Sequence, residues 1–258
     1  MNDPNANPAL QIRDLSYRYS DSAQEILRIP DLTIASGQFV SLLGVSGSGK
    51  STLLRLMAGL LAATNGEVNH DRSGECEIGM VFQNPNLVPW RSARDNVSLP
   101  GELGTNSHPK KTISFDELLL LVGLRPEDAE KRPHELSGGM QMRVSLARSL
   151  SLSPSMLLLD EPFGALDDLL RMQLEEELRR IHVSRGLTTV LVTHNISEAA
   201  FMSDRVLILA GQPASIVGDI AIDLPPNRDG SVREGSEFQR IQAGITQKFR
   251  ATAASDAV

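Results

Sequence analysis

Two short segments of this chain contain residue types that can bind phosphate groups. The first, residues 44–51 (Gly-Val-Ser-Gly-Ser-Gly-Lys-Ser), follows the pattern G-x-x-x-x-G-K-[ST]. Glycines let the backbone N–H groups of such a loop turn inward around an anion. Lys50 can place its charge on the β- and γ-phosphates, and the Ser51 hydroxyl can ligate Mg²⁺. We therefore predict a nucleoside triphosphate site formed by Gly44, Val45, Ser46, Gly47, Ser48, Gly49, Lys50, Ser51 and Thr52.

The segments on either side of this loop support that interpretation. The apolar run Phe39–Leu43 precedes it and is typical of a buried strand, and residues 51–61 carry apolar side chains at the spacing of one helix face. The motif requires this context, because the loop N–H groups then meet the anion at a helix N-terminus. The alternative, a glycine-rich turn that contains a lysine by chance, explains neither flanking element.

A second apolar run ends in two adjacent carboxylates. Residues 156–159 are followed directly by Asp160 and Glu161, and neighbouring side chains of a strand point in opposite directions. Beside a phosphate loop, we assign Asp160 to Mg²⁺ through water and Glu161 to the attacking water as general base. A strand followed by Asp-Glu is also common at helix N-termini, so the assignment depends on the phosphate loop.

The elements that must position these residues can be read from the hydrophobic pattern. Short apolar runs alternate with helical stretches, which predicts a largely parallel sheet covered by helices. Residues 84–155 contain no convincing strand and predict a helical subdomain with an exposed loop at residues 101–112. An apolar stripe over residues 170–181 predicts a helix whose charged residues 175–177 and 179–180 face solvent. Further strands are expected at residues 78–82, 156–159, 189–192 and 206–209, and a further helix at residues 237–249.

Composition narrows the class of protein. The 258 residues carry a net charge of −7 with no basic stripe, which argues against nucleic acid as a partner. The single cysteine, Cys76, excludes a disulfide framework and suits a reducing compartment. No apolar run approaches the roughly 20 residues of a membrane span, and the polar first residues lack a signal core. We therefore expect a cytoplasmic chain that can still sit on a membrane protein.

The second phosphate-binding segment, residues 136–141 (Leu-Ser-Gly-Gly-Met-Gln), lies about 90 residues after the first and resembles the signature of the ABC (ATP-binding cassette) proteins. The resemblance extends over residues 10–210. It implies an α/β fold: a P-loop NTPase (RecA-like) core with an N-terminal antiparallel β part and an inserted helical subdomain. The implied domains are an ATP-binding core at residues 1–84 and 156–222, a helical signature subdomain at 85–155 and a C-terminal extension at 223–258.

The resemblance also assigns single residues. Gln83, after the strand at 78–82, is similar to the glutamine that contacts Mg²⁺ and water and senses the neighbouring subunit; a surface glutamine is the alternative. His194 resembles the switch histidine that holds the γ-phosphate and the catalytic glutamate, although most single histidines are structural. Asp167 resembles the aspartate of the D-loop, and it can equally cap a helix. Tyr19 resembles the aromatic that stacks on adenine, with Tyr17 as the competing choice and a core role possible for either.

The signature segment implies a partner. Ser137, Gly138 and Gly139 precede the helical stretch 140–150, so their N–H groups form a second anion-binding helix start. In the ABC family this surface faces the phosphate loop of a second cassette, and two ATP molecules are held between the subunits. The implied partner is a second copy of this chain or a homologous cassette. A Ser-Gly-Gly helix cap alone would not explain so complete a match.

A softer resemblance points to importer ATPases for nitrate, sulfonate, taurine and related small anions. It rests on residues 87–90, 95–97, 133–136 and 161–167; Met142 and Asn195 depart from the usual pattern. It implies transmembrane permease subunits, an extracytoplasmic solute-binding protein, and a peripheral position on the cytoplasmic face of the inner membrane. Leu87, Val88 and Trp90 then predict a docking surface for the permease, unless Trp90 packs inside the helical subdomain.

Two alternatives remain at this point. An ABC ATPase outside transport, such as one that serves iron–sulfur cluster assembly, shares every catalytic motif, although residues 87–90 favour transport. An ABC protein that acts on DNA in chromosome maintenance or repair would have a long heptad insertion and a basic surface, and the sequence has neither.

Overall fold

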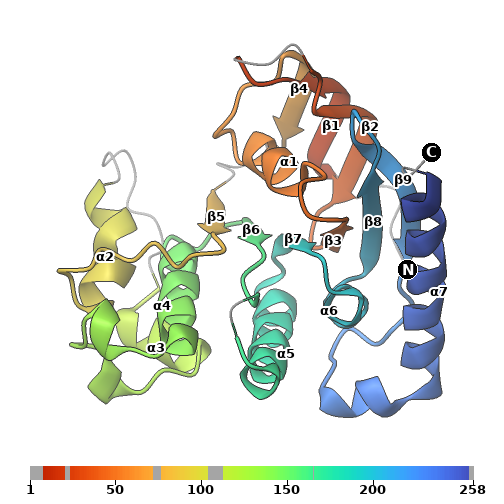
Figure 1. Ribbon diagram of the computed structural model, residues 1–258. Helices are drawn as coiled ribbons and strands as arrows, with labels where there is room; N and C mark the ends of the chain where they lie inside the picture. Colours follow the sequence, from red (N-terminus) through yellow and green to blue (C-terminus); the bar gives the residue numbers. More distant parts are fainter. Residues whose placement is uncertain (1–7, 21–23, 72–76, 104–112, 165, 256–258) are drawn as a thin grey trace.

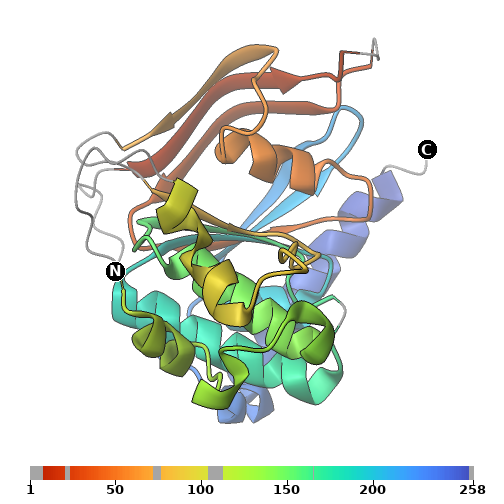
Figure 2. The same ribbon diagram turned by 90° about the vertical axis from the view of Figure 1, so that its left-hand side faces the viewer.

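The computed structural model describes residues 8–20, 24–71, 77–103, 113–164 and 166–255. Figures 1 and 2 show a three-stranded sheet with helix α1 beneath it, then a six-stranded sheet, and then the remaining helices on the far side. Cys76 and residues 104–112 of the expected exposed loop lie outside the described residues. No helix within the described ranges has the length and apolar character needed to cross a membrane.

The six-stranded sheet carries the predicted parallel core. Its order is β5-β6-β7-β3-β8-β9, and every neighbouring pair is parallel except β8 and β9. Parallel strands end at one edge, so the loops after β3, β5, β6 and β7 gather there. The strands are β3 (Phe39–Leu43), β5 (Ile78–Val81), β6 (Met156–Asp160), β7 (Thr188–Thr193), β8 (Arg205–Ala210) and β9 (Ser215–Ala221).

The N-terminal antiparallel part forms the second sheet. Its order is β2-β1-β4, with strands β1 (Pro8–Tyr17), β2 (Leu27–Ala35) and β4 (Asn65–His70). Alternate residues of β1 and β2 are buried against α1 (Lys50–Met57) and one face of the parallel strands. This packing fixes α1, and therefore the loop before it, between the two sheets.

Helices cover the other face of the six-stranded sheet. A second core joins residues of β3, β6, β7 and β8 to these helices, because successive strand residues point to opposite faces. In Figure 1, α2, α3 and α4 form a group beside β5, and α7 lies along β8 and β9. The helices are α2 (Ala93–Leu103), α3 (Phe115–Leu121), η1 (Pro126–Asp128), η2 (Pro133–Glu135), α4 (Gly138–Leu150), α5 (Asp168–Arg185), α6 (Ile196–Met202), η3 (Gly230–Glu234) and α7 (Ser236–Ser255).

Several expected boundaries are corrected. Helix α1 stops at Met57 rather than residue 61, because Gly59 adopts a left-handed φ of 69°. Helix α2 continues to Leu103, so residues 101–103 are helical rather than loop. Strand β9 was not predicted. The C-terminal helix extends to Ser255, beyond the expected end at residue 249.

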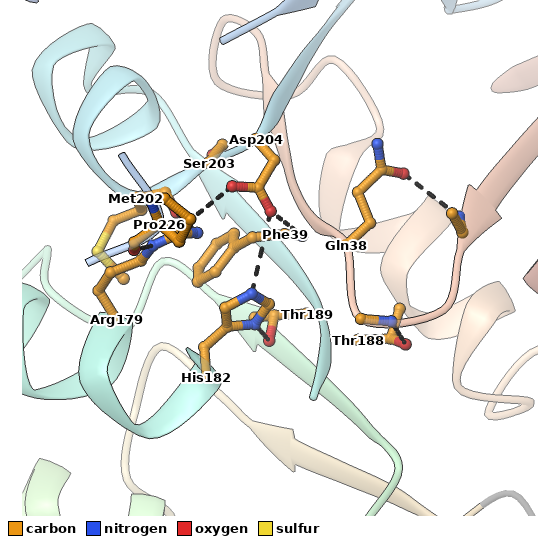
Figure 3. A network of polar contacts seen from close by, with 12 residues as sticks. Gln38, Phe39, Arg179, His182, Thr188, Thr189, Met202, Ser203, Asp204 and Pro226 are labelled. Atoms are coloured by element: carbon orange, nitrogen blue, oxygen red, sulfur yellow. Dashed lines mark hydrogen bonds and ion pairs between the residues drawn. The ribbon is translucent and has the colours of Figure 1, made fainter. Parts of the chain in front are cut away.

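The prediction that residues 175–177 and 179–180 of α5 all face solvent is also partly wrong. Glu175 and Arg179 are only 2% exposed each. Arg179 donates to Asp204 Oδ1 at 2.7 Å and to the carbonyl oxygens of Met202 and Pro226 at 2.9 Å each, as Figure 3 shows. Asp204 also accepts from the Phe39 amide at 2.9 Å. This buried network ties α5 and β3 to the segment that begins the C-terminal extension.

Arg228 extends the same network. Its guanidinium donates to the carbonyl oxygens of Phe201 and Ser203, at 2.7 and 2.8 Å. His182 lies on the other side, with Nδ1 3.0 Å from Thr189 Oγ1. Burial, reinforced by the positive charge of Arg179, lowers the pKa of His182 from 6.5 to about 4, so this imidazole is neutral at pH 7.

Candidate functional site

The loop between β3 and α1 has the form of an anion cradle. Gly47 and Gly49 adopt positive φ values of 80° and 84°, which side-chain-bearing residues rarely take. A Cβ on Gly44 would lie 2.7 Å from the carbonyl oxygen of Leu209, so glycine is also required for space there. The Ser48 hydroxyl is buried without a hydrogen-bond partner, which leaves it free to bind a phosphate oxygen.

Lys50 closes the cradle from inside. Its Nζ donates to the carbonyl oxygens of Gly44 and Val45 at 2.9 and 2.7 Å. Burial lowers the pKa of Lys50, and the negative charges of Glu161 and Asp160 oppose that shift. The ammonium group is therefore held within the loop, where two neutral carbonyl oxygens accept from it.

Ser51 and Asp160 meet across the two neighbouring elements. The Ser51 hydroxyl at the start of α1 donates to Asp160 Oδ1 at 2.7 Å, and Asp160 ends the buried strand β6. Hydroxyl and carboxylate oxygens are the ligands that Mg²⁺ prefers. These two residues, 109 positions apart, therefore form a pair that fits a magnesium ion beside the phosphate loop.

Glu161 and His194 form a second pair at the same edge of the sheet. His194 follows β7, and its Nδ1 lies 3.1 Å from Glu161 Oε2. Glu161 has a φ of 45°, which is uncommon for a residue with a side chain and turns the chain sharply after Asp160. The side chain of His194 is 58% exposed and that of Glu161 is 20% exposed, so both can reach a ligand.

The loop that carries His194 is fixed by its own neighbours. Asn195 caps α6, and its Oδ1 accepts from the amides of Ser197 and Glu198 at 2.9 and 3.2 Å. The Asn195 amide donates to Thr193 Oγ1 at 2.9 Å, and Thr193 also shares a hydrogen bond with the Glu198 carboxyl. Asn195 thus keeps a capping role where aspartate is usual. Glu198 was missed from the sequence, because a glutamate on a helix ordinarily faces solvent.

The two tyrosines differ in exposure. Tyr19 is 41% exposed and its hydroxyl lies 3.0 Å from Thr52 Oγ1 of α1, whereas Tyr17 is 7% exposed. Their rings meet edge to face, with centroids 5.1 Å apart. Tyr19 is therefore the more exposed of the two rings, and it lies next to the first helix after the phosphate loop.

Gln83 lies at the surface between β5 and α2, whereas Leu87 of the segment after it is half-buried and packs against the core beneath the helices. No hydrogen bond among the described residues connects Gln83 to Ser51 or Asp160. Asn96 holds the segment: its Oδ1 accepts from the Val88 amide at 2.7 Å, and its Nδ2 donates to the Ser92 carbonyl at 2.9 Å. Trp90 is 74% exposed, so the alternative that it packs inside the helical subdomain is wrong.

The signature segment begins α4 with an exposed helix N-terminus. Ser137 is the N-cap, and its Oγ accepts from the Met140 amide at 3.3 Å. Ser137 and Gly138 are exposed, whereas a Cβ on Gly139 would lie 2.2 Å from Leu170 Cδ2. Figure 1 shows α4 grouped with α2 and α3, apart from α1 and its phosphate loop. The structure therefore does not bring these residues together with Lys50 of the same chain.

Asp167 caps α5, with Oδ1 accepting from the Leu170 amide at 3.0 Å. The carboxylate is exposed at the start of that helix, and residue 165, two positions before it, lies outside the described residues. The capping role is confirmed, and it leaves the second carboxylate oxygen available.

Comparison with known proteins agrees with this arrangement. The family model described as ABC transporter matches residues 27–164. The aliphatic sulfonates import ATP-binding protein SsuB 1 of Xanthomonas axonopodis pv. citri (strain 306) is 39% identical over 242 residues, which cover 92% of this chain and 95% of that protein. The nitrate import ATP-binding protein NrtC of Synechococcus elongatus (strain ATCC 33912 / PCC 7942 / FACHB-805) is 45% identical over 209 residues, which cover 78% of this chain but only 32% of that protein.

Solved structures show the same likeness. The cassette MJ0796, determined as a dimer in a post-hydrolysis state with ADP and Pi, is 29% identical, with a TM-score of 0.71 over 84% of this chain and all of that one. CbiO1 from Clostridium perfringens, part of the ABC transporter complex cbiONQ, is 25% identical, with a TM-score of 0.70 over 93% of this chain and 99% of that one. The predicted α/β cassette fold is confirmed, and the chain belongs to the ABC transporter family.

Proposed function

We propose that this chain is the ATP-hydrolysing subunit of a bacterial ABC importer. The observation that carries the proposal is the cluster at the sheet edge, where the phosphate loop, the Ser51–Asp160 pair and the Glu161–His194 pair converge from β3, β6 and β7. Because the chain belongs to the ABC transporter family, we infer that the ligand of this cluster is ATP.

Each of these residues has a proposed role. The loop amides and Lys50 hold the β- and γ-phosphates, and Tyr19 stacks on adenine. Mg²⁺, held by Ser51, Gln83 and Asp160, would neutralise charge on the phosphate oxygens. Glu161 accepts a proton from the attacking water, and His194 orients Glu161 and contacts the γ-phosphate.

The site is completed in trans. Ser137, Gly138 and Gly139 lie at the start of α4, which Figure 1 shows apart from α1 and its phosphate loop, and Asp167 has an exposed carboxylate at the start of α5. We infer that they meet the nucleotide on a second cassette, so that two ATP molecules lie between two subunits. The dimeric form of the MJ0796 cassette is consistent with this arrangement. ATP closes the dimer, and hydrolysis with phosphate release opens it again.

The transported solute is inferred from relatives. SsuB 1 and NrtC are named as import ATP-binding proteins for aliphatic sulfonates and nitrate. CmpC of Synechococcus elongatus (strain ATCC 33912 / PCC 7942 / FACHB-805), which is 44% identical over 205 residues, is named as a bicarbonate transport ATP-binding protein. These solutes share a small anionic form. We propose an anion of this kind, delivered by an extracytoplasmic binding protein to permease subunits that this chain contacts at the cytoplasmic face of the inner membrane. These relatives do not favour the iron–sulfur assembly alternative.

The decisive experiment is reconstitution with candidate permease subunits chosen from the genes that neighbour the gene for this chain. We expect the full chain to co-purify with those membrane subunits and to hydrolyse ATP in proteoliposomes when Mg²⁺ is present, with uptake of the anion. An ATPase that neither binds the permease nor supports uptake would overturn the importer assignment while leaving the ATPase assignment intact.

A further inference from the structure

Arg233, in the short helix η3 of the C-terminal extension, packs against the helix that follows His194. Its guanidinium forms an ion pair with Glu175 of α5 and donates to Ser197 Oγ of α6 at 3.4 Å. The same group lies over the Phe201 ring of α6, 3.8 Å from its centroid. The Arg233 side chain is 15% exposed, so these contacts are made largely out of water.

Helix α6 in turn fixes the loop of His194. The helix begins at Ile196, and Asn195 caps it through the amides of Ser197 and Glu198. The Glu198 side chain bonds back to Thr193, the residue before His194. A shift of α6 would therefore move both neighbours of His194 and change its contact with Glu161.

Two buried carboxyls lie near Arg233, one on α5 and one on α6. Glu175 is 2% exposed and Glu198 is 5% exposed, and burial raises the pKa of both carboxyls, that of Glu198 to about 8. Glu198 also leaves one carboxylate oxygen buried without a hydrogen bond. Arg171 and Arg233 provide the positive charge on this cluster. Arg233 opposes the effect of burial on the pKa of Glu175, and their ion pair links η3 to α5 beside α6.

The extension that carries Arg233 is itself anchored. Arg179 binds the Pro226 carbonyl, and Arg228 binds the Phe201 and Ser203 carbonyls just after α6. Helix α7 packs against α6 and η3. Residues 226–233 therefore contact α6 at its first turn, its aromatic residue and its C-terminal end.

We propose that Arg233 is a positioning residue for ATP hydrolysis: from the C-terminal extension it holds α6 so that His194 stays in contact with Glu161. The inference rests on the proposed function. It gives the C-terminal extension a part in the catalytic step, although the extension contributes no group that touches the nucleotide.

The test separates positioning from simple folding. Arg233→Ala alone leaves Glu175 buried and unpaired, so the main variant is Arg233→Ala with Glu175→Gln, which removes both charges. We expect the double variant to melt near the wild-type temperature and to bind a fluorescent ATP analogue with unchanged affinity, while its kcat falls about ten-fold or more. Arg233→Lys, which keeps a positive charge beside Glu175, should have a kcat between that of the double variant and that of the wild type. Arg240→Ala, which removes an exposed arginine of α7 paired with Glu237, is the matched control and should change nothing.

A wild-type kcat in the double variant would overturn the proposal, because Arg233 would then only neutralise Glu175. An equal loss of ATP affinity and kcat would also overturn it, since the change would then not be confined to the His194 loop. If the wild-type chain hydrolyses ATP and Glu161→Gln does not, the ATPase part of the proposed function stands whichever result the Arg233 variants give.

Discussion

Replacing Glu161 by glutamine tests the chemical role of the Glu161–His194 pair. Glutamine has nearly the same shape as glutamate, so it can keep the contact that Glu161 Oε2 makes with His194 Nδ1 at 3.1 Å. It can also adopt the same backbone conformation, with a φ of 45°. The phosphate loop and the Ser51–Asp160 pair are untouched. The variant loses only the ability to accept a proton from water. We expect kcat to fall by about 10²–10³, equivalent to about 3–4 kcal/mol of transition-state stabilisation.

Two assays on the purified chain measure this effect. Phosphate release gives kcat, and light scattering with ATP and Mg²⁺ gives the fraction of dimer. Glu161→Gln should bind ATP normally and accumulate the closed dimer, because binding without hydrolysis cannot reopen it. Glu127→Gln is the matched control: it makes the same chemical change at a side chain that is 62% exposed, and it should match the wild type in both assays. Hydrolysis by Glu161→Gln at a rate near wild type would refute the assignment of Glu161 as general base.

Three further variants test other parts of the structure. Because burial lowers the pKa of His182 to about 4 from 6.5, its contribution to the free energy of unfolding is present above pH 6.5 and is lost as the pH falls toward 4. In urea titrations the stability difference between wild type and His182→Gln should therefore change by up to about 3 kcal/mol over that window, and a difference independent of pH would contradict the buried neutral imidazole. Tyr19→Leu should weaken ATP binding by about 1–3 kcal/mol through lost stacking, whereas Tyr17→Leu, which also removes an aromatic ring, should leave it unchanged; the reverse order would assign adenine to Tyr17. Trp90→Ala should keep ATP binding but weaken assembly with the permease by about 2 kcal/mol or more, and normal assembly would exclude a docking role.

The parts of the site that sequence predicted are those in which neighbouring residues along the chain act together. The strand Phe39–Leu43, the glycine-rich turn and the start of α1 are contiguous, so their pattern contains the whole local structure. Asp160 and Glu161 likewise follow directly from the end of a buried apolar run. The pairing of Ser51 with Asp160 requires only that β6 lie in the same parallel sheet as β3.

The parts that sequence missed depend on partners far along the chain. Glu175 and Arg179 have the spacing of a solvated helix face, but their partners Arg233 and Asp204 come from the C-terminal extension and the start of β8. Charged residues bury only when such partners are supplied, and helical periodicity contains no information on them. Strand β9 was missed for a related reason. It lies at the edge of the sheet, where its residues are at most half-buried, so it lacks the continuous apolar run of a central strand.

The central claim is that each ATP site is built from two chains, and a complementation experiment tests it most directly. Lys50→Ala removes the charge that the phosphate loop holds, and Ser137→Arg blocks the exposed start of α4. Each variant alone should hydrolyse almost no ATP, but a mixture forms heterodimers in which one of the two sites has both faces intact. We predict that mixing restores a measurable part of the wild-type rate, with a dependence on protein concentration that follows dimer formation. No recovery in heterodimers isolated with two different tags, or a wild-type rate from a chain that stays monomeric with ATP bound, would contradict the account.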